Sequence, residues 1–246
     1  MNIIKQEAKK FASKNICFGL INIDMIKQDF HNLVLPKNNI IIYRGWMLNK
    51  TDYICLYSLI KSQGAFLYTN PSNYLLAHHL PNWYPILKDL TPQTIIIKDL
   101  ANLKVELKKI GWQKYFIKDF VKSLKTSVGS IITDTDDIDI LIQEMIKYRG
   151  HIEGGICVRK VEDFLLETEK RYFIINNKPY ASQKKFDIPD IVYECAKRIK
   201  SPFFSVDYIK TKNNQERIVE IGDGQVSDLV GWSVERFVEI WEHQNC

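Results

Sequence analysis

Two carboxylates in neighbouring apolar runs near the end of the chain are the strongest candidates for chemistry. Asp207 lies within residues 203–209 and Glu220 lies within residues 217–221. If Asn213-Asn214 forms a two-residue turn, which Asn favours because it tolerates positive φ, the two runs pair as a hairpin. Asp207 then stands directly opposite Glu220. Because like charges opposed across a ladder repel, we expect a cation between them.

A third carboxylate, Asp223, follows where a Gly-Asp-Gly triplet ends the second run, and it can fold back towards the first two. Three converging oxygen donors suit Mg²⁺, which proteins hold through one or two carboxylates together with substrate phosphates. We therefore predict that Asp207, Glu220 and Asp223 bind magnesium. The alternative is a solvated hairpin face that is neutralised by Lys210 or Lys212.

Cationic side chains earlier in the chain could hold an anion. Lys118 ends an aromatic, apolar run, where an ammonium group is costly to bury without a negative partner. Lys122, in the loop that follows, fits an anion or plain solvation equally well. Arg159 and Arg171 lie in two later β-like runs and could clamp phosphates bidentately. An ordinary salt bridge to a glutamate of residues 162–169 is the alternative for each arginine.

The elements that must position these side chains alternate between short β-like runs and helical stretches. Residues 40–43 and 65–68 are expected to be strands on either side of a helix at 52–62, a pattern that implies a small parallel sheet. Residues 81–85 contain two prolines and two aromatic residues, so they are expected to form a fixed connection near a domain boundary. We therefore expect a first α/β domain over residues 1–92.

Two further parts follow this first domain. Residues 94–98 and 114–119 are expected to be strands flanking a helix at 102–110, and from residue 155 the pattern becomes β-rich. The later strands are expected at 156–160, 171–176, 203–210 and 216–221. The sequence thus predicts an α+β protein whose second and third parts span residues 93–150 and 151–246.

Composition and charge exclude several classes of protein. Hydrophobic residues make up 46% of the chain and charged residues 26%, as in an ordinary folded domain. We find no membrane-length apolar run, no secretory leader and no disulfide or zinc pattern among the five cysteines, so we expect a cytoplasmic protein. The net charge of +5 falls on residues 1–92, but its basic residues are scattered and form no stripe of the kind that binds nucleic acid. P-loop and dinucleotide-binding motifs are missing.

Taken in order, these features resemble the ATP-grasp superfamily, from about residue 93 to the C-terminus. More narrowly, the chain is similar to the clade of small ATP-grasp proteins named for two arginines and a lysine. The stretches that carry this similarity are Tyr148-Arg149-Gly150, Glu153-Gly154-Gly155, Ser201–Asp207 and Val219–Trp232. The resemblance implies an ATP-grasp fold, in which two α+β subdomains sandwich the nucleotide, preceded by a small α/β pre-ATP-grasp domain.

The resemblance also implies a role for each candidate residue. Lys118 and Arg171 would steady the phosphates during catalysis, the loop at 122–130 would cover them, and the strand at 158–164 would meet adenine and ribose. The implied ATP-binding residues are Lys118, Lys122, Arg159, Lys160, Glu162, Glu169 and Arg171, and the implied magnesium ligands are Asp207, Glu220 and Asp223. The loop departs from the family because it has one glycine, and Asp223 stands where the commoner pattern has Asn.

The implied activity is ATP-dependent ligation. A substrate carboxylate would attack the γ-phosphate, and an amine would capture the resulting acyl phosphate, while the protein positions the substrates and neutralises charge. The substrates could be small molecules, peptide ends or protein side chains. Two alternatives stay open: a nucleotide-binding sensor without turnover, and an ATP-dependent nucleic-acid-end ligase, which the basic first third of the chain would suit.

Overall fold

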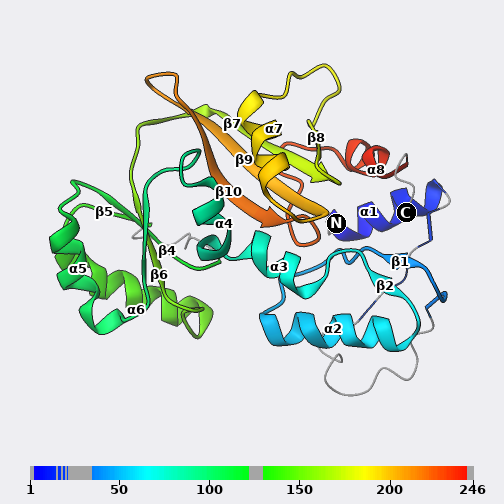
Figure 1. The fold of residues 1–246 in the computed structure, drawn as a ribbon, viewed down its shortest axis with the longest axis horizontal. Coiled ribbons are helices and arrows are strands. Elements are labelled where there is room, and N and C mark those ends of the chain that lie inside the picture. The colour runs from blue at the N-terminus through cyan, green and yellow to red at the C-terminus, as the bar shows by residue number, and fades with distance from the viewer. Residues whose placement is uncertain are drawn as a thin grey trace. The chain divides into compact units, whose positions relative to one another are not determined.

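The computed structural model describes residues 3–14, 16–17, 19, 21, 35–121 and 130–242, which form an α+β structure (Figure 1). The helices are α1 (Ile3–Ser13), α2 (Lys50–Ser62), α3 (Pro71–His78), α4 (Leu80–Leu87), α5 (Leu103–Ile110), α6 (Ile138–Arg149), α7 (Asp190–Arg198) and α8 (Val234–Glu242). The strands are β1 (Ile40–Ile41), β2 (Phe66–Leu67), β3 (Thr94–Ile97), β4 (Tyr115–Asp119), β5 (Ile131–Ile132), β6 (Ile156–Lys160), β7 (Phe164–Ile175), β8 (Lys178–Tyr180), β9 (Phe203–Thr211) and β10 (Glu216–Asp223). Among the residues described, no helix has the length and apolar character needed to cross a lipid bilayer.

The chain divides into two compact units, each of which is described by itself. The first unit comprises Met1–Ala77, Lys170–Asp207 and Ile221–Cys246, and the second comprises His78–Glu169 and Tyr208–Glu220. Strands β7, β9 and β10 contribute residues to both units. The division predicted at residues 92 and 150 stays a prediction, and the two units cut across it.

The first unit contains the parallel β-α-β arrangement that the sequence predicts. Strand β1 pairs in parallel with β2, and α2 connects them. Tyr53, Leu56 and Ile60 on one face of α2 are fully buried in the core that they form with these strands. A second core in the same unit gathers the aromatic rings of β7, β9 and α8, with Phe173 and Phe203 at its centre.

The second unit contains a four-stranded antiparallel sheet in the order β3-β6-β4-β5. Leu107 of α5 and Leu141 and Met145 of α6 are fully buried against it, and together with Ile117 they form the core of this unit. Helix α5 ends at Gly111, which takes the left-handed conformation expected of a glycine stop (φ 65°). The sheet therefore holds β4 and β6, which carry Lys118 and Arg159, in a fixed register.

Two predicted connections are regular elements instead. Residues 81–85 lie inside α4, because Pro81 occupies the first turn, where a helix needs no amide donor, and because Leu80, Trp83 and Leu87 are buried. Strand β7 begins at Phe164 rather than at residue 171, because its first half is largely exposed and therefore lacks the apolar alternation that marks a strand.

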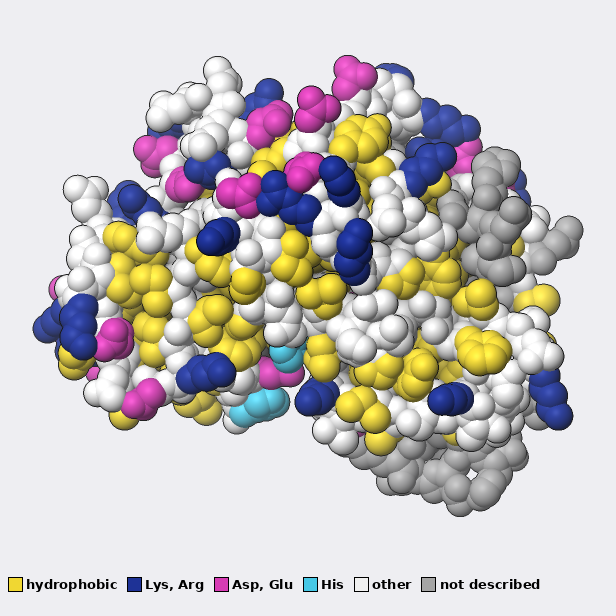
Figure 2. Space-filling model, in the orientation of Figure 1, with side chains coloured by type: hydrophobic (Ala, Val, Ile, Leu, Met, Phe, Trp, Pro, Cys, Tyr) yellow, Lys and Arg dark blue, Asp and Glu magenta, His cyan; other side chains and the backbone are white. Residues whose placement is uncertain are grey.

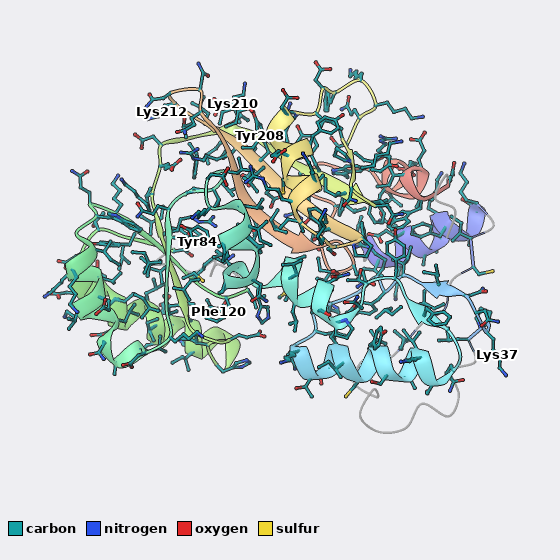
Figure 3. All side chains as sticks on the ribbon, viewed as in Figure 1. Lys37, Tyr84, Phe120, Tyr208, Lys210 and Lys212 are labelled. Atoms are coloured by element: carbon teal, nitrogen blue, oxygen red, sulfur yellow. The ribbon has the colours of Figure 1, made fainter. Side chains whose placement is uncertain are left out.

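The connection before β6 depends on Gly154. Gly154 has φ +77°, and a Cβ atom there would meet the ring of Phe120, the residue labelled beside β4 in Figure 3. The amide of Phe120 donates to the carbonyl oxygen of Glu153 at 3.4 Å. The glycine thus lets this connection lie directly against the end of β4.

We predict that Gly154→Ala destabilises the protein more than Gly111→Ala. Both glycines have positive φ, which costs an alanine about 1 kcal/mol, but a Cβ at Gly111 meets nothing within 4 Å. The clash with Phe120 should raise the loss for Gly154→Ala to roughly 2–5 kcal/mol. Urea unfolding of the two variants measures the difference, and equal losses would contradict the close approach.

Candidate functional site

Lys118 lies on β4 in the interior of the second unit, with 5% of its surface exposed. Its Nζ donates to Oε1 of Glu220 on β10 at 3.1 Å. Across the sheet it pairs with Cys157, whose thiol pKa is raised by burial to about 12, so this neighbour carries no charge near neutral pH. The expectation that a lysine in this strand requires an anion is met here by a carboxylate of the chain itself.

Arg159 lies on β6, two residues along from Cys157, and is also buried, with 6% of its surface exposed. Its Nη1 donates to the carbonyl oxygen of Val219, and its Nε lies 3.4 Å from Oγ1 of Thr94. Among the described residues, Nη2 of Arg159 has no hydrogen-bond partner. No described carboxylate lies within ion-pair distance of the Arg159 guanidinium group. Burial lowers the pKa of Arg159, although the nearby carboxylate of Glu220 opposes this. The alternative for Arg159, a salt bridge to a glutamate of residues 162–169, is not formed among the described residues.

Arg171 lies on β7 in the first unit and grips Asp207 of β9 with two hydrogen bonds. Nε donates to Oδ1 at 2.7 Å and Nη2 donates to Oδ2 at 2.6 Å. Nη1 donates to the carbonyl oxygen of Asp228 at 2.9 Å, and the side chain of Trp232 donates to the carbonyl oxygen of Arg171 itself. This fork-to-carboxylate geometry is the strongest form of ion pair that a protein makes. The salt bridge offered as the alternative for Arg171 therefore exists, but its partner is Asp207.

The connection from β6 to β7 carries the residues expected at the nucleotide base. Lys160 ends β6 and is exposed. Glu162 follows it, and its Oε2 accepts a hydrogen bond from Nε of Arg217 at 2.9 Å. Glu169 is exposed on β7, two residues before Arg171. Arg217 is a residue that sequence reasoning did not single out, although its place in the run that carries Glu220 could have signalled a partner for a nearby acid.

Lys122 and most of the loop at 122–130 lie outside the described residues.

The turn between β9 and β10 differs from the one expected. The amide of Asn214 donates to the carbonyl oxygen of Thr211 at 2.8 Å, and the amide of Thr211 donates to the carbonyl oxygen of Gln215 at 2.9 Å. The loop therefore has three residues, of which only Asn214 has positive φ (59°). The expected two-residue turn is wrong, because that turn needs positive φ at both Asn213 and Asn214, whereas a type I turn followed by one left-handed residue needs it once.

Asp223 differs from the other two predicted magnesium ligands because it is fully buried. Its Oδ1 accepts hydrogen bonds from the backbone amide and the side-chain amide of Gln225, at 3.0 and 3.2 Å, while its Oδ2 has no partner within the described chain. Burial raises the pKa of Asp223 to about 7, and the hydrogen bonds from Gln225 oppose that rise. Loss of solvent on burial is therefore the main cause of this raised pKa.

Gln225 is a second residue that the sequence did not single out. It is fully buried, and its side chain also donates to the hydroxyl of Tyr53 at 2.6 Å and accepts from the amide of Tyr43 at 3.1 Å. A glutamine immediately after the Gly-Asp-Gly triplet was the available signal. Through it, Asp223 is connected to the first 77 residues of the chain.

The three predicted magnesium ligands are divided between the two units. No group of three His, Cys, Asp or Glu side chains among the residues described could hold a metal ion. Asp207 and Asp223 belong to the first unit and Glu220 to the second, and the chain passes from one unit to the other directly after Asp207 and directly after Glu220. A three-carboxylate site therefore stays a prediction.

A family model matches residues 98–241, more than half of the chain. It describes the ATP-grasp domain of family 3 in the clade named for two arginines and a lysine. A comparison with curated proteins finds no match.

Three solved structures share the fold at low sequence identity. A RimK domain ATP-grasp protein from Sphaerobacter thermophilus DSM 20745 is 12% identical with a TM-score of 0.54, over 77% of this chain and 76% of that one. D-alanine–D-alanine ligase from Bacillus anthracis, complexed with ATP, is 16% identical with a TM-score of 0.53, over 75% and 72%. The macrocyclase MdnC from Microcystis aeruginosa MRC, bound with precursor peptide MdnA, is 16% identical with a TM-score of 0.52, over 77% and 68%. At these identities the likeness establishes the fold alone.

The raised pKa of Asp223 predicts how stability depends on pH in the metal-free protein. A carboxyl whose pKa is higher in the folded state favours folding when it is protonated, so its contribution is complete below pH 4 and is lost as the pH rises to about 7. Relative to wild type, Asp223→Asn should therefore gain up to about 4 kcal/mol of unfolding free energy between pH 4 and pH 8. Urea unfolding in the presence of a chelator measures this difference, and a constant difference at all pH values would contradict it.

Proposed function

Since the chain belongs to family 3 of the ATP-grasp clade named for two arginines and a lysine, we propose that it is an ATP-dependent ligase that joins a carboxylate to an amine. The observation that carries this proposal is that each unit holds one cation paired with one carboxylate at the positions where the family resemblance puts phosphate-binding and magnesium-binding groups. Lys118 pairs with Glu220 in the second unit, and Arg171 pairs with Asp207 in the first. The names of two solved relatives, a ligase and a macrocyclase, support the same class of reaction.

The two pairs can exchange partners when Mg-ATP binds. Lys118 and Arg171 would leave their carboxylates and bind phosphate oxygens, and Asp207 and Glu220 would then bind the metal. Charge stays balanced at each step, because each cation moves from one anion to another. In the absence of nucleotide, each pair keeps its own charges neutralised.

Arg159 supplies a positive charge that is available before any exchange. Its buried Nη2 has no partner within the described chain, and a buried unpaired donor costs about 1–3 kcal/mol. A phosphate oxygen would satisfy this donor. We therefore expect Arg159 to hold phosphate from the start, and Lys118 and Arg171 to add their charges as the pairs open.

Asp207 and Glu220 fit magnesium by their chemistry. Both are carboxylates, and this ion needs only one or two carboxylates when phosphates and water complete its shell. When bound, magnesium would neutralise negative charge on the phosphates. Asp223 fits this role less well, because its Oδ1 is occupied by Gln225 and the residue is fully buried.

The reaction itself requires positioning rather than a nucleophile from the protein. The substrate carboxylate attacks the γ-phosphorus, ADP leaves, and the amine then displaces phosphate from the acyl phosphate. Lys118 and Arg171 would stabilise the negative charge that moves onto ADP during the first step. Glu162, exposed in part and held by Arg217, would accept hydrogen bonds from the ribose hydroxyls, and Lys160 and Glu169 would lie near the nucleotide.

The structure offers little support for nucleic acid as a substrate. On the face drawn in Figure 2, lysine and arginine side chains are interspersed with acidic ones and form no continuous basic stripe. A nucleotide sensor without turnover would keep the same ion pairs but would release no ADP. Both alternatives are therefore decided by the assay that follows.

We predict that the wild-type protein releases ADP from Mg-ATP when it is given a pool of amino acids, peptides and RNA. Lys118→Met should lower the rate by about 100-fold or more, because it removes a charge that binds phosphate. Arg171→Lys should also lower it, because lysine cannot form the two-bond grip. Lys109→Met is the matched control, since Lys109 is an exposed lysine paired with Glu106, and its rate should equal that of wild type.

Three outcomes would contradict the proposal. ADP release that needs RNA and falls steeply with salt would favour a nucleic-acid-end ligase. ATP binding without ADP release in any pool would favour a sensor. A Lys118→Met variant as active as Lys109→Met would remove Lys118 from the site.

We also predict that Glu162→Ala weakens ATP binding by about tenfold, through loss of a hydrogen bond to ribose. Because the substitution also leaves Arg217 without its carboxylate, it should lower the unfolding free energy by about 1 kcal/mol. Arg217→Gln serves as the control, since it breaks the same ion pair but keeps Glu162. If Arg217→Gln weakens ATP binding as much as Glu162→Ala does, Glu162 has only a structural role.

A further inference from the structure

The loop after β1 displays the most exposed large apolar side chain of the described residues. Trp46 has 76% of its surface exposed. Exposed tryptophan side chains are uncommon in the absence of a partner, and tryptophan is among the residues that contribute most when a surface binds another molecule. Its position in the chain belongs to the first unit.

The backbone that carries Trp46 is fixed rather than free. The hydroxyl of Tyr43 donates to the carbonyl oxygen of Trp46 at 2.7 Å, and the amide of Gly45 donates to the carbonyl oxygen of Gln225 at 3.3 Å. A Cβ atom at Gly45 would meet the ring of Tyr43, so the close fold of this loop requires a glycine there. The indole is therefore presented from a backbone that loses little freedom on binding.

The same loop is bonded to the segment that leads to Arg171. Arg44 donates through Nη1 to the carbonyl oxygens of Gly224 and Ser227, at 2.6 and 3.1 Å. The next residue, Asp228, accepts the hydrogen bond from Nη1 of Arg171 already described. All of these contacts lie within the first unit, and the loop of Trp46 and the Arg171–Asp207 pair are both hydrogen-bonded to the segment at 224–228.

The chemistry of these two segments favours a ligand with an apolar group. Arg44, the one charged side chain of the loop, is bound by Glu7 through Nε and Nη2, at 2.8 Å for each bond, and by carbonyl oxygens of the neighbouring segment through Nη1. In that neighbouring segment Val230 is also apolar and 60% exposed, and Asp228 is an exposed acid. Trp46 and Val230 are thus exposed apolar residues on two segments that Arg44 joins by hydrogen bonds, and Asp228 is an exposed acid in the segment of Val230. These groups suit a ligand that has an apolar side chain and an amine.

We propose that Trp46 binds an apolar side chain of the second substrate, and that this substrate is an amino acid or peptide. The inference rests on the proposed ligase function, because it concerns the molecule that supplies the carboxylate or the amine. The contact would fix the apolar side chain while the reacting group reaches the phosphates. The contact with Trp46 would select among substrates by their side chains. The affinity of the protein for ATP would not depend on this contact.

The test compares dipeptides that carry the same amine and carboxylate but different side chains. ADP release from Mg-ATP is measured with Leu-Gly and Phe-Gly against Gly-Gly, for wild type, Trp46→Ala, Trp46→Phe and Phe66→Ala. Phe66 is the matched control, because it is an aromatic residue of the same unit that is 55% exposed on β2. Thermal melts of every variant with and without Mg-ATP show that each is folded and binds nucleotide.

We expect wild type and Phe66→Ala to release ADP with Leu-Gly or Phe-Gly at least about tenfold faster than with Gly-Gly. Trp46→Ala should lose this preference, Trp46→Phe should keep much of it, and all four proteins should gain the same melting temperature from Mg-ATP. If Mg-ATP stabilises wild type but no dipeptide stimulates ADP release, or if Trp46→Ala keeps the preference, the inference is wrong and the nucleotide site stands. If wild type gains nothing from Mg-ATP, the proposed function fails and the inference fails with it.

Discussion

The pairing of Lys118 with Glu220, and of Arg171 with Asp207, is the interaction on which the rest of this structure depends. Arg171 and Asp207 are both largely buried, and Lys118 is buried beside a Glu220 side chain that keeps 40% of its surface exposed. A buried charge of this kind is tolerable only with an opposite charge in good geometry. Strands β4, β7, β9 and β10 supply one member each, so the sheets hold the pairs in place. A protein that must bind a triphosphate and a metal ion needs the same charges. Under the proposed function, the pairs neutralise these charges until nucleotide and metal ion bind.

Other buried polar residues, besides the two pairs, have different hydrogen-bonding states and therefore different roles. Arg159 is buried, and its Nη2 has no hydrogen-bond partner among the described residues, as expected of a group that binds an anionic ligand. Asp223 and Gln225 instead form a buried hydrogen-bonded network that ties the acidic strand end to the first 77 residues. That connection joins the N-terminal segment to the end of β10 within one compact unit, and the contact of Phe11 with Phe237 joins α1 to α8 in the same unit.

Sequence reasoning reached the family, the sheets and the cations because each leaves a local pattern. Lys118 ends an apolar run, Arg171 directly precedes the apolar run at 172–175, and the parallel β-α-β unit shows two short apolar runs on either side of a helical stretch. Sequence reasoning failed where the partner of a side chain depends on packing between distant parts of the chain. Only the fold reveals that the partner of Arg171 is Asp207, 36 residues away. The turn at Asn214 was misjudged because two turn types accept the same residues, and the first half of β7 was missed because exposed strands lack alternation.

The most direct test of this account is the affinity for Mg²⁺ in the absence of nucleotide, measured by titration for wild type and Lys118→Met, together with the affinity for ATP. If Lys118 and Glu220 exchange partners, removing the lysine removes the cation that competes with the metal ion for this carboxylate. Lys118→Met should then bind Mg²⁺ alone more tightly than wild type, by roughly tenfold, and bind ATP more weakly. The predicted result is therefore that the affinity for Mg²⁺ rises and the affinity for ATP falls in the same variant. If the affinity of Lys118→Met for Mg²⁺ is no higher than that of wild type, Lys118 does not compete with a metal ion for Glu220, and the account is wrong.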